Sequence, residues 1–594
     1  MAYSAPVSEI LFALRHAAGM DRGIAEQVFP ELADGFAETI LLEAAKFGDA
    51  VLAPLNRIGD KHGTSLKDAV VTTAPGWKEA YRQWMEAGWN GLSGEAAFGG
   101  QDMPRIINAA CYDMWSGANM AFALCPLLTA GAAEAIATHG SAALKATYLE
   151  KLVTGEWTGT MNLTESQAGS DLAALRTKAE RHADGSYRIT GQKIFITYGE
   201  HDLTENIIHL VLARLPDGPA GTRGLSLFVV PKFLVNADGS LGARNDVHCS
   251  GIEHKLGINA SPTCTMAFGD RGGATGWLLG EENRGLACMF TMMNNARLGT
   301  ALQGVGLAEA ATQHATHYAA DRRQGRAPGA TGPAMSPIAE HPDIRRNLMT
   351  MRGYAEAARA ICYATAEATD RAHRGRSTEE RTHALERAAL LTPLAKAFSS
   401  DIGNEVASLG VQVHGGMGYI EETGAAQFMR DVRIVGIYEG TNGIQAIDLV
   451  QRKIGLGGGE AVAREIADMR SGLEQVRARN AASFGKMAHR LTEAVDAFER
   501  ATHFLQSATP VAALAGATPY LRLFGLARGG VSLAEMAVAA HRLASSGDSD
   551  PAHARRIATA RFFAENLSTA APGLEASIVE GGAFAGEADH AIAS

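Results

Sequence analysis

The composition of this 594-residue chain excludes several classes of protein. Apolar residues make up 46% and charged residues 20% of it, which is ordinary for a water-soluble globular protein. The net charge of −10 argues against nucleic acid or an anionic membrane as the main partner. None of the six cysteines has CxxC spacing, so we expect reduced, buried thiols and no metal site. Length alone predicts about four domains.

Targeting and membrane signals are weak in this sequence. The first residues contain neither a cationic segment nor an apolar core, so we expect no signal peptide and a cytoplasmic protein. The most apolar run, 120–133, is interrupted by Pro126 and stopped by Glu134. A membrane span needs about 20 residues. We therefore predict a core helix here and no membrane span.

The first part of the chain, residues 1–158, is predicted to be a helical domain with a short extension to about residue 38. Apolar residues recur there at helical spacing, and residues 88–101 are glycine-rich and predicted to form a loop. The helix candidates are 44–52, 77–86 and 106–120.

Residues 159–285 show period-two patterning and are predicted to form a middle β domain. Several short strands without intervening helices favour a barrel or sandwich. The strand candidates are 187–190, 193–197, 207–215, 225–230 and 265–268. The predicted fold class is therefore mainly α with a central β-barrel or sandwich.

Helical patterning returns in residues 286–455, which are predicted to form a bundle. Its helix candidates are 292–318, 344–369 and 386–413, with a Pro/Gly-rich loop at 325–342. Pro393 should kink or begin the last of these helices. A glycine-rich linker follows at 455–459, and the Ala-rich residues 460–594 are predicted to form an extra helical domain.

The segment 435–445 carries the strongest candidate for catalysis. One carboxylate, Glu439, lies between a tyrosine and a Gly-Thr turn, and a helix-like segment follows. A carboxylate fixed on a short turn can act as a general base. The alternative is that Glu439 complements the positive N-terminal end of the following helix.

Six motifs in a fixed order resemble the acyl-CoA dehydrogenase family of flavoenzymes. They are 161–171, 193–197, Arg297, 321–323, 412–418 and the Glu439 turn. The resemblance covers about residues 40–455 and implies the helical, β, helical architecture. The chain length and the run 255–264 are similar to a large bacterial branch with an extra C-terminal domain. Some members of that branch act on fatty acyl-CoAs and others on 3-methylthiopropanoyl-CoA.

This resemblance implies an FAD-dependent oxidation of an acyl-CoA to the trans-2-enoyl-CoA. Glu439 takes the α-proton, flavin N5 takes the β-hydride, and electron-transfer flavoprotein accepts the electrons. The family also implies a homodimer at least. An acyl-CoA oxidase that uses oxygen is the alternative. A nucleic-acid-associated flavoprotein is disfavoured, because residues 460–594 hold 13 Lys/Arg against 15 Asp/Glu and lack a basic footprint.

The resemblance also assigns contacts to individual residues. Flavin contacts fall on Met161, Leu163, Thr164, Gly169, Ser170, Phe195, Thr197, Arg322, Gln412, Gly416 and Thr441. Substrate contacts fall on Ser170, Asn294, Arg297 and Gly440. Departures from the family occur at Ser166-Gln167, at Phe195 in place of Trp, at Gln324 to Arg326, and at Gly443 in place of Gln.

Structural alternatives remain open for four of these sites. Ser170-Asp171 suits a helix N-cap, and the Gly415-Gly416 pair suits a helix C-cap. Phe195 could be an ordinary strand core residue. Asn294 and Arg297, three residues apart on one helix face, could be a surface capping pair.

Overall fold

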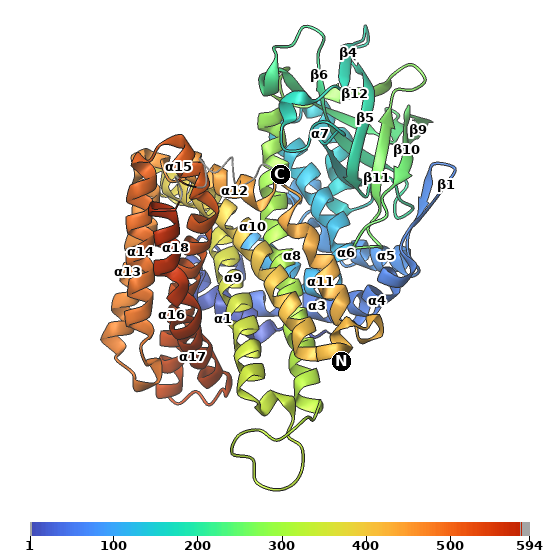
Figure 1. Ribbon diagram of the computed structural model, residues 1–594. Coiled ribbons are helices and arrows are strands. Elements are labelled where there is room, and N and C mark those ends of the chain that lie inside the picture. Colours follow the sequence, from blue (N-terminus) through green and yellow to red (C-terminus); the bar gives the residue numbers. More distant parts are fainter. Residues whose placement is uncertain (1–2, 582–583, 585–594) are drawn as a thin grey trace. The chain divides into compact units, whose positions relative to one another are not determined.

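The chain folds into two compact units, shown in Figure 1 as a computed structural model that describes residues 3–581 and 584. We call them the helical unit and the β unit. The helical unit comprises Met1–Lys46, Pro104–Gly117 and Thr300–Ser594, and the β unit comprises Phe47–Met103 and Ala118–Gly299. The mainly helical fold class with a central β-rich part is confirmed. The division into 1–158, 159–285, 286–455 and 460–594 stays a prediction, and the end of its last segment lies outside the described residues.

An eight-stranded sheet forms the centre of the β unit, in the order β10-β11-β5-β12-β7-β6-β3 with β4 beside β5 and β6 (Figure 1). Only the β3–β6 and β4–β6 pairs are parallel among the described strands. The strands are β3 (Thr158–Asn162), β4 (Lys178–Arg181), β5 (Tyr187–Thr197), β6 (Ile207–Arg214), β7 (Leu225–Pro231), β10 (Val247–Ile252), β11 (Thr263–Phe268) and β12 (Ala274–Leu278). Two hairpins flank this sheet: β1 (Ser65–Lys67) with β2 (Val70–Thr72), and β8 (Phe233–Val235) with β9 (Leu241–Arg244).

Apolar side chains cover both faces of this sheet. Leu210 and Leu227 join a cluster with Leu128 and Leu149 from the helices. Val211 and Phe228 point into a second cluster that contains Phe268. Strands β6 and β7 are therefore buried at almost every position, and their sequences are continuously apolar rather than alternating.

The strand predictions are confirmed but incomplete. The candidates 187–190 and 193–197 are one strand, β5, and the candidates at 207–215, 225–230 and 265–268 correspond to β6, β7 and β11. Sequence patterning missed β3, β4, β10 and β12, which have only four to six residues each. Strands this short show too few alternations for the period to be recognised.

The helices of the first 160 residues are divided between the two units. Those of the helical unit are α1 (Val7–His16), α2 (Met20–Ala25) and α3 (Phe36–Phe47). Those of the β unit are α4 (Ala53–His62), α5 (Trp77–Glu86) and α7 (Ala142–Thr154). The prediction of a helix at 77–86 is confirmed, and its apolar face buries Trp77, Tyr81 and Trp84.

Helix α6 (Arg105–His139) corrects the interpretation of the apolar run 120–133. The run is not a separate short helix, because the helix extends for 35 residues and continues past Pro126. Its irregularity lies at Asn119, whose φ and ψ are not helical and whose Oδ1 accepts a hydrogen bond from the N–H of Phe122. By length and composition α6 could cross a membrane, but 83% of its most apolar window is buried inside the protein.

Three long helices lie in the helical unit, the first of them only from residue 300 onward, because its earlier residues belong to the β unit. They are α8 (Gly285–Asp321), α9 (Pro342–Arg374) and α10 (Thr378–His414), and the predicted loop 325–342 connects the first two. Helix α10 continues through Pro393, so the expectation that a helix begins there is wrong. Shorter helices follow, α11 (Ala425–Val432) and α12 (Asn442–Asp448).

Six further α-helices follow the glycine-rich linker within the described part of the chain. They are α13 (Glu460–Arg479), α14 (Met487–Ser507), α15 (Pro510–Ala515), α16 (Ala517–Ser545), α17 (Ala552–Phe562) and α18 (Ala571–Val579). Helix α16 is at their centre and packs against α13, α14, α17, α18 and α9. It too is long and apolar enough to span a membrane, but 89% of its most apolar window is buried.

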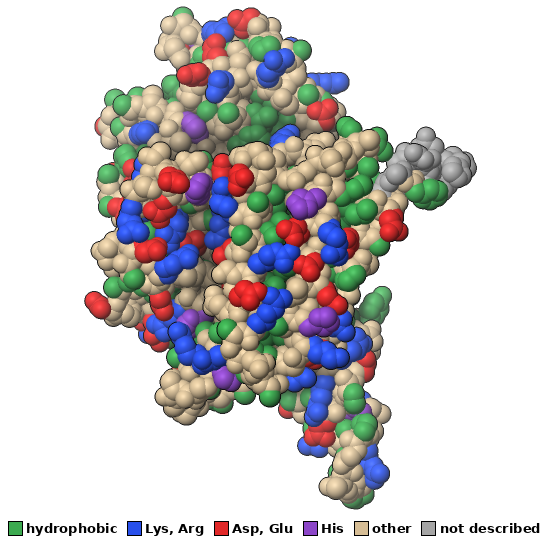
Figure 2. Space-filling model, turned by 90° about the vertical axis from the view of Figure 1, so that its left-hand side faces the viewer, with side chains coloured by type: hydrophobic (Ala, Val, Ile, Leu, Met, Phe, Trp, Pro, Cys, Tyr) green, Lys and Arg blue, Asp and Glu red, His purple; other side chains and the backbone are tan. Residues whose placement is uncertain are grey.

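Glycines let α16 approach its neighbours closely. A Cβ at Gly525 would lie 2.1 Å from the Phe398 ring, and one at Gly529 would lie 2.9 Å from the Ala357 side chain. Both of these contacts reach α9 or α10. Figure 2 shows one face of the molecule, on which Lys and Arg are intermingled with Asp and Glu. An exposed ion pair of the last helices joins Arg470 to Asp496 at 2.8 Å.

Candidate functional site

The turn that carries Glu439 lies between Gly436 and α12 in the helical unit. Glu439 has a φ of 58° and Gly440 a φ of 84°, so two successive residues are left-handed. For a residue with a Cβ this conformation costs roughly 1–2 kcal/mol. Such strain persists only where surrounding contacts impose it, and it is concentrated at functional sites.

Hydrogen bonds hold the backbone of this turn from the side of α12. The Thr441 hydroxyl accepts from the N–H of Ile444 at 3.2 Å and so caps α12. The Gln445 amide donates to the carbonyl oxygens of Glu439 at 3.2 Å and Gly440 at 3.4 Å. The cap of α12 is therefore supplied by Thr441. The alternative that the charge of Glu439 complements the positive end of this helix stays a prediction.

A buried chain of polar side chains anchors the residue before Glu439. The Tyr438 hydroxyl donates to Gln303 Oε1, and Gln303 Nε2 donates to the Tyr112 hydroxyl at 3.0 Å. Burial raises the pKa of Tyr438 well above its usual value, so the phenol stays protonated. The turn is thus fixed at Tyr438, Glu439, Gly440 and Thr441, and the sequence gives no sign of the Gln303 contact.

In the β unit, the loop after β3 carries the second group of predicted residues. Thr164 is half-buried, whereas Gly169 and Ser170 are exposed, and a Cβ at Gly169 would meet nothing within 4 Å. The cap predicted at Ser170-Asp171 is made by Asp171, whose carboxylate accepts from the N–H of Ala173 at 2.9 Å. Ser170 is therefore left to face solvent. Earlier in the segment, Met161 is half-buried in β3 and Leu163 is buried.

Phe195 is not the strand core residue that the structural alternative describes. Its ring is 57% exposed, and its φ is 59°. It lies where the register between β5 and β11 shifts, because three steps on β5 (193 to 196) face two on β11 (264 to 266). A bulge of this kind re-aims a side chain. Thr197 resumes regular pairing opposite Thr263.

A buried ion pair joins this bulge to the loop after β3. Lys193 Nζ donates to Glu165 Oε1 at 2.9 Å and to the carbonyl oxygen of Leu163 at 2.8 Å. The N–H of Ile194 donates to the carbonyl oxygen of Thr164 at 2.9 Å. The structure therefore brings Leu163, Thr164 and Phe195 into one assembly.

The Glu165 carboxylate is the centre of that assembly, and sequence reasoning missed it. Burial alone would raise its pKa, but the charge of Lys193 and hydrogen bonds from Thr177 and Arg176 hold the pKa at about 2. Glu165 is 6% exposed and Lys193 is fully buried. A lysine directly before the apolar run Ile194 to Ile196 was the available signal, since buried lysines are almost always paired.

Asn294 and Arg297 lie together on α8 in the β unit. Arg297 Nη1 donates to Asn294 Oδ1 at 3.4 Å, and the guanidinium lies 5.7 Å from the centre of the Phe290 ring. The predicted shared helix face is confirmed. Arg297 is 9% exposed whereas Asn294 is exposed, so the alternative of a surface pair describes Asn294 but not Arg297.

Three predicted residues lie on other elements of the helical unit. Arg322 follows α8, is exposed, and donates to Gln324 Oε1 at 3.0 Å. Gln412 is exposed in the last turn of α10, and Gly415 caps that helix, as the structural alternative stated. A Cβ at Gly416 would meet nothing within 4 Å.

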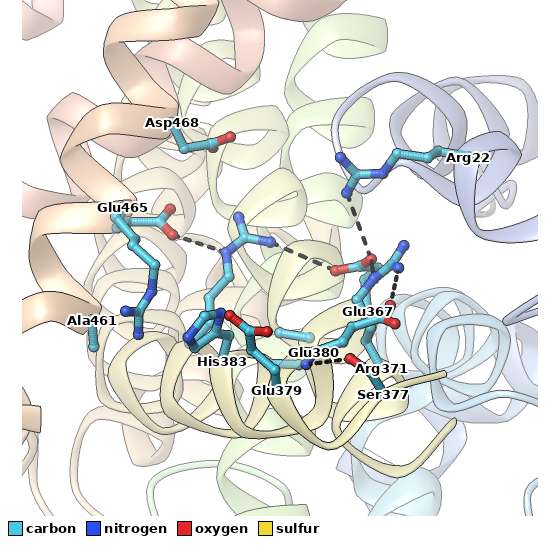
Figure 3. Close-up of a pocket in the computed structure, with 14 residues that line it drawn as sticks. Arg22, Glu367, Arg371, Ser377, Glu379, Glu380, His383, Ala461, Glu465 and Asp468 are labelled. Carbon is cyan, nitrogen blue, oxygen red and sulfur yellow. Dashed lines mark hydrogen bonds and ion pairs between the residues drawn. The ribbon is translucent and has the colours of Figure 1, made fainter. Parts of the chain in front are cut away.

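A separate pocket of the helical unit contains none of the predicted residues. Figure 3 shows that charged side chains of α2, α9, α10 and α13 line it, among them Arg371 and Glu367. Arg387 donates to Glu465 at 2.8 Å and lies 3.6 Å from Glu367. These ion pairs connect α13 to the α9–α10 pair.

Known proteins resemble this chain along almost its whole length. Residues 38–156, 160–270 and 283–454 match the N-terminal, middle and C-terminal domains of acyl-CoA dehydrogenase. Residues 463–588 match the acetyl-CoA dehydrogenase C-terminal-like domain.

Two relatives and one solved structure cover most of this chain. It is 47% identical over 571 residues to the 3-methylmercaptopropionyl-CoA dehydrogenase of Ruegeria pomeroyi, with 96% of each chain covered. It is 33% identical to the broad-specificity linear acyl-CoA dehydrogenase FadE5 of Mycobacterium tuberculosis, with 95% of each covered. An acyl-CoA dehydrogenase of Bacillus anthracis complexed with FAD is 21% identical, with a TM-score of 0.73 over 95% of this chain and 90% of that one.

Proposed function

We propose that this chain, which belongs to the acyl-CoA dehydrogenase family, oxidises an acyl-CoA thioester to the trans-2-enoyl-CoA with FAD as its cofactor. The observation that carries the proposal is the strained turn that presents Glu439. A carboxylate held this firmly is suited to remove the α-proton, and positioned proton transfer contributes about 10²- to 10⁴-fold to a rate.

Each unit, taken by itself, contains residues that suit a flavin. The β unit offers an exposed aromatic ring at Phe195 and an open backbone at Gly169, and the helical unit offers an open backbone at Gly416. When bound, FAD supplies the acceptor for the hydride that leaves the β-carbon, which no amino-acid side chain can provide. The residues that would hold it are Met161, Leu163, Thr164, Gly169, Ser170, Phe195, Thr197, Arg322, Gln412, Gly416 and Thr441.

The thioester requires donors at its carbonyl oxygen and contacts along its pantetheine chain. The backbone N–H of Glu439 is the proposed donor, since hydrogen bonds to the developing negative charge acidify the α-hydrogen. Ser170, Asn294, Arg297 and Gly440 are the proposed further contacts. The hydrogen bond between Arg297 and Asn294 supports their acting together.

For the acyl group, we favour a short chain that bears a thioether, as in 3-methylthiopropanoyl-CoA. The 47% identity to the Ruegeria pomeroyi enzyme over 96% of each chain supports this substrate. A linear fatty acyl-CoA is the second candidate, because the Mycobacterium tuberculosis relative is a broad-specificity linear acyl-CoA dehydrogenase. Anaerobic titration with both thioesters separates the two, because the preferred one bleaches the flavin at the lower concentration.

The proposed electron acceptor is electron-transfer flavoprotein, and both near full-length relatives are named dehydrogenases. The alternative is an oxidase that uses oxygen. Turnover in air without an acceptor protein distinguishes them. Rapid peroxide release under those conditions would reject the dehydrogenase assignment.

We propose that the protein is a cytoplasmic homodimer or a higher homo-oligomer. Exposed apolar side chains in the segment between α10 and α11 and on α11 support self-association, because large apolar surfaces are usually covered by a partner. They are Met417, Tyr419, Ile420 and Met429, of which Tyr419 is 88% exposed. Sedimentation of the Tyr419→Ser variant tests this, and an unchanged monomeric mass in both proteins would contradict it.

A further inference from the structure

Lys396 is a lysine of α10 with no exposed surface, in an apolar stretch between Leu394 and Phe398. Its ammonium donates to the carbonyl oxygen of Gly440 at 2.8 Å and to Asn442 Oδ1 at 2.9 Å. Burying an ammonium group is costly unless hydrogen bonds replace its water. The first hydrogen bond ends on the turn that carries Glu439, and the second ends on the first residue of α12, directly after the turn.

Asn442 also forms hydrogen bonds with residues of α10. Its amide nitrogen donates to Asp401 Oδ1 at 2.7 Å and to the carbonyl oxygen of Ala397 at 3.3 Å. Helix α10 therefore holds the turn through the backbone of Gly440 and holds the start of α12 through the side chain of Asn442. Because α10 is long and its apolar side is buried, it is a rigid support for the turn.

We propose that Lys396 is a positioning residue for Glu439. The Gly440 carbonyl belongs to the peptide that follows the second left-handed residue, so fixing it limits rotation of the backbone next to Glu439. Without the ammonium, the strained turn can relax and the carboxylate moves away from the α-hydrogen. This role rests on the proposed function, because it presupposes that Glu439 is the base.

The test compares Lys396→Met and Lys396→Arg with the wild-type holoenzyme in anaerobic stopped-flow flavin reduction. The substrates are 3-methylthiopropanoyl-CoA or butyryl-CoA and the same thioesters with two deuteriums at the α-carbon. Methionine keeps an unbranched side chain one atom shorter than lysine but removes the charge and the donors. A displacement of about 1 Å can cost on the order of 10²-fold in rate, so we expect Lys396→Met to reduce the flavin 10- to 100-fold more slowly.

Two further readouts separate positioning from general damage. We expect the substrate concentration at half-maximal rate to change by less than about threefold, since the lost interaction acts on the chemical step. The α-deuterium isotope effect should rise as proton removal becomes slower than other steps. Lys396→Arg, which keeps a cation and donors, should recover part of the rate.

Lys232→Met is the matched control, because Lys232 is another buried lysine and holds Glu200 in the β unit. It should lose thermal stability and keep both the rate and the isotope effect. If Lys396→Met does not fold, Asn442→Ala removes one partner of the ammonium and should show the same rise in isotope effect. A wild-type rate and isotope effect in the folded Lys396 variants would overturn the proposal, whereas a wild-type protein that no acyl-CoA bleaches would overturn the proposed function itself.

Discussion

The Glu439 turn and the Phe195 bulge reach the same backbone conformation by different means. Both residues carry a Cβ and have φ near 60°. In the helical unit, side chains of Gln445 and Lys396 bind the carbonyls of the turn. In the β unit, the extra residue of a bulge imposes the conformation through strand pairing. The Glu439 turn is held by side chains, and a point mutation can remove each of them separately. The conformation of Phe195 instead depends on the register between β5 and β11.

The largest effect is expected at Glu439, because this residue of the turn is the proposed base. Glu439→Gln keeps the shape of the side chain and the turn but removes the base, so the rate of flavin reduction should fall by about 10²- to 10⁴-fold. Stopped-flow bleaching with the preferred acyl-CoA measures it. Glu79→Gln, which changes an exposed carboxylate outside the proposed site, serves as the control. Bleaching at full speed in Glu439→Gln would remove Glu439 from its assigned role.

The second-largest effect is expected at the ion pair between Lys193 and Glu165, and it should lower the stability of the folded protein. Glu165→Gln leaves the buried Lys193 without its counter-charge, and removing one partner of a buried pair typically costs about 3–5 kcal/mol. Calorimetry of the protein without cofactor should show a lower melting temperature. The exposed pair between Arg82 and Glu79 offers a control, Glu79→Gln, which should leave the melting temperature almost unchanged.

The pH dependence of stability should report the same carboxylate. The pKa of Glu165 is lowered to about 2 in the folded protein from 4.5, so its contribution is present above pH 4.5 and is lost as the pH falls toward 2. The full contribution corresponds to about 3 kcal/mol. Between pH 4.5 and 3 the wild type should therefore lose stability faster than Glu165→Gln. Parallel curves for the two proteins would show that the ion pair does not hold the carboxylate ionised.

Phe195→Gly should separate strain from ligand contact at the bulge. Glycine adopts a positive φ without penalty, and the exposed ring contributes little packing, so the cofactor-free protein should gain up to about 1 kcal/mol or stay unchanged. Affinity for FAD should nevertheless fall, measured by fluorescence titration. Phe195→Val, which combines branching with a positive φ, should be destabilised instead. Undiminished FAD affinity in Phe195→Gly would remove the ring from the cofactor site.

The smallest effect is expected at the cap of α12. Thr441→Ala removes the acceptor for the Ile444 N–H, which typically costs about 1 kcal/mol. Hydrogen exchange should show that amide exchanging several-fold faster, while Thr441→Ser should preserve its protection. Equal exchange in all three proteins would mean that the other contacts of the turn are sufficient to hold it.

Much of this architecture could be predicted because it follows from local patterning. The helix at 77–86, the strand candidates and the shared face of Asn294 and Arg297 depend on short-range periodicity, and the sequence records it directly. The ordered motifs also placed Glu439 on a turn before a helix. None of these predictions required knowledge of residues distant in the chain.

The contacts that hold the site could not be predicted in this way. Lys396 meets Gly440 across 44 residues, and Tyr438 meets Gln303 across 135, so only the folded chain shows these pairs. The positive φ of Glu439 and Phe195 was equally hidden, because neither is a residue type that favours it. The available sign of these contacts was a lysine within an apolar segment, at positions 193 and 396. Such a lysine predicts a buried, paired ammonium group but does not show which residues pair with it.

The glycine contacts of α16 have a practical consequence for anyone who shortens this protein. Since Gly525 and Gly529 bring that helix directly onto Phe398 and Ala357, the appended helices and the central bundle share one interior. Cutting the chain after Gly459 would expose the apolar surface of α9 and α10 that α16 covers. Such a fragment should precipitate, and its inactivity would say nothing about what the last domain does.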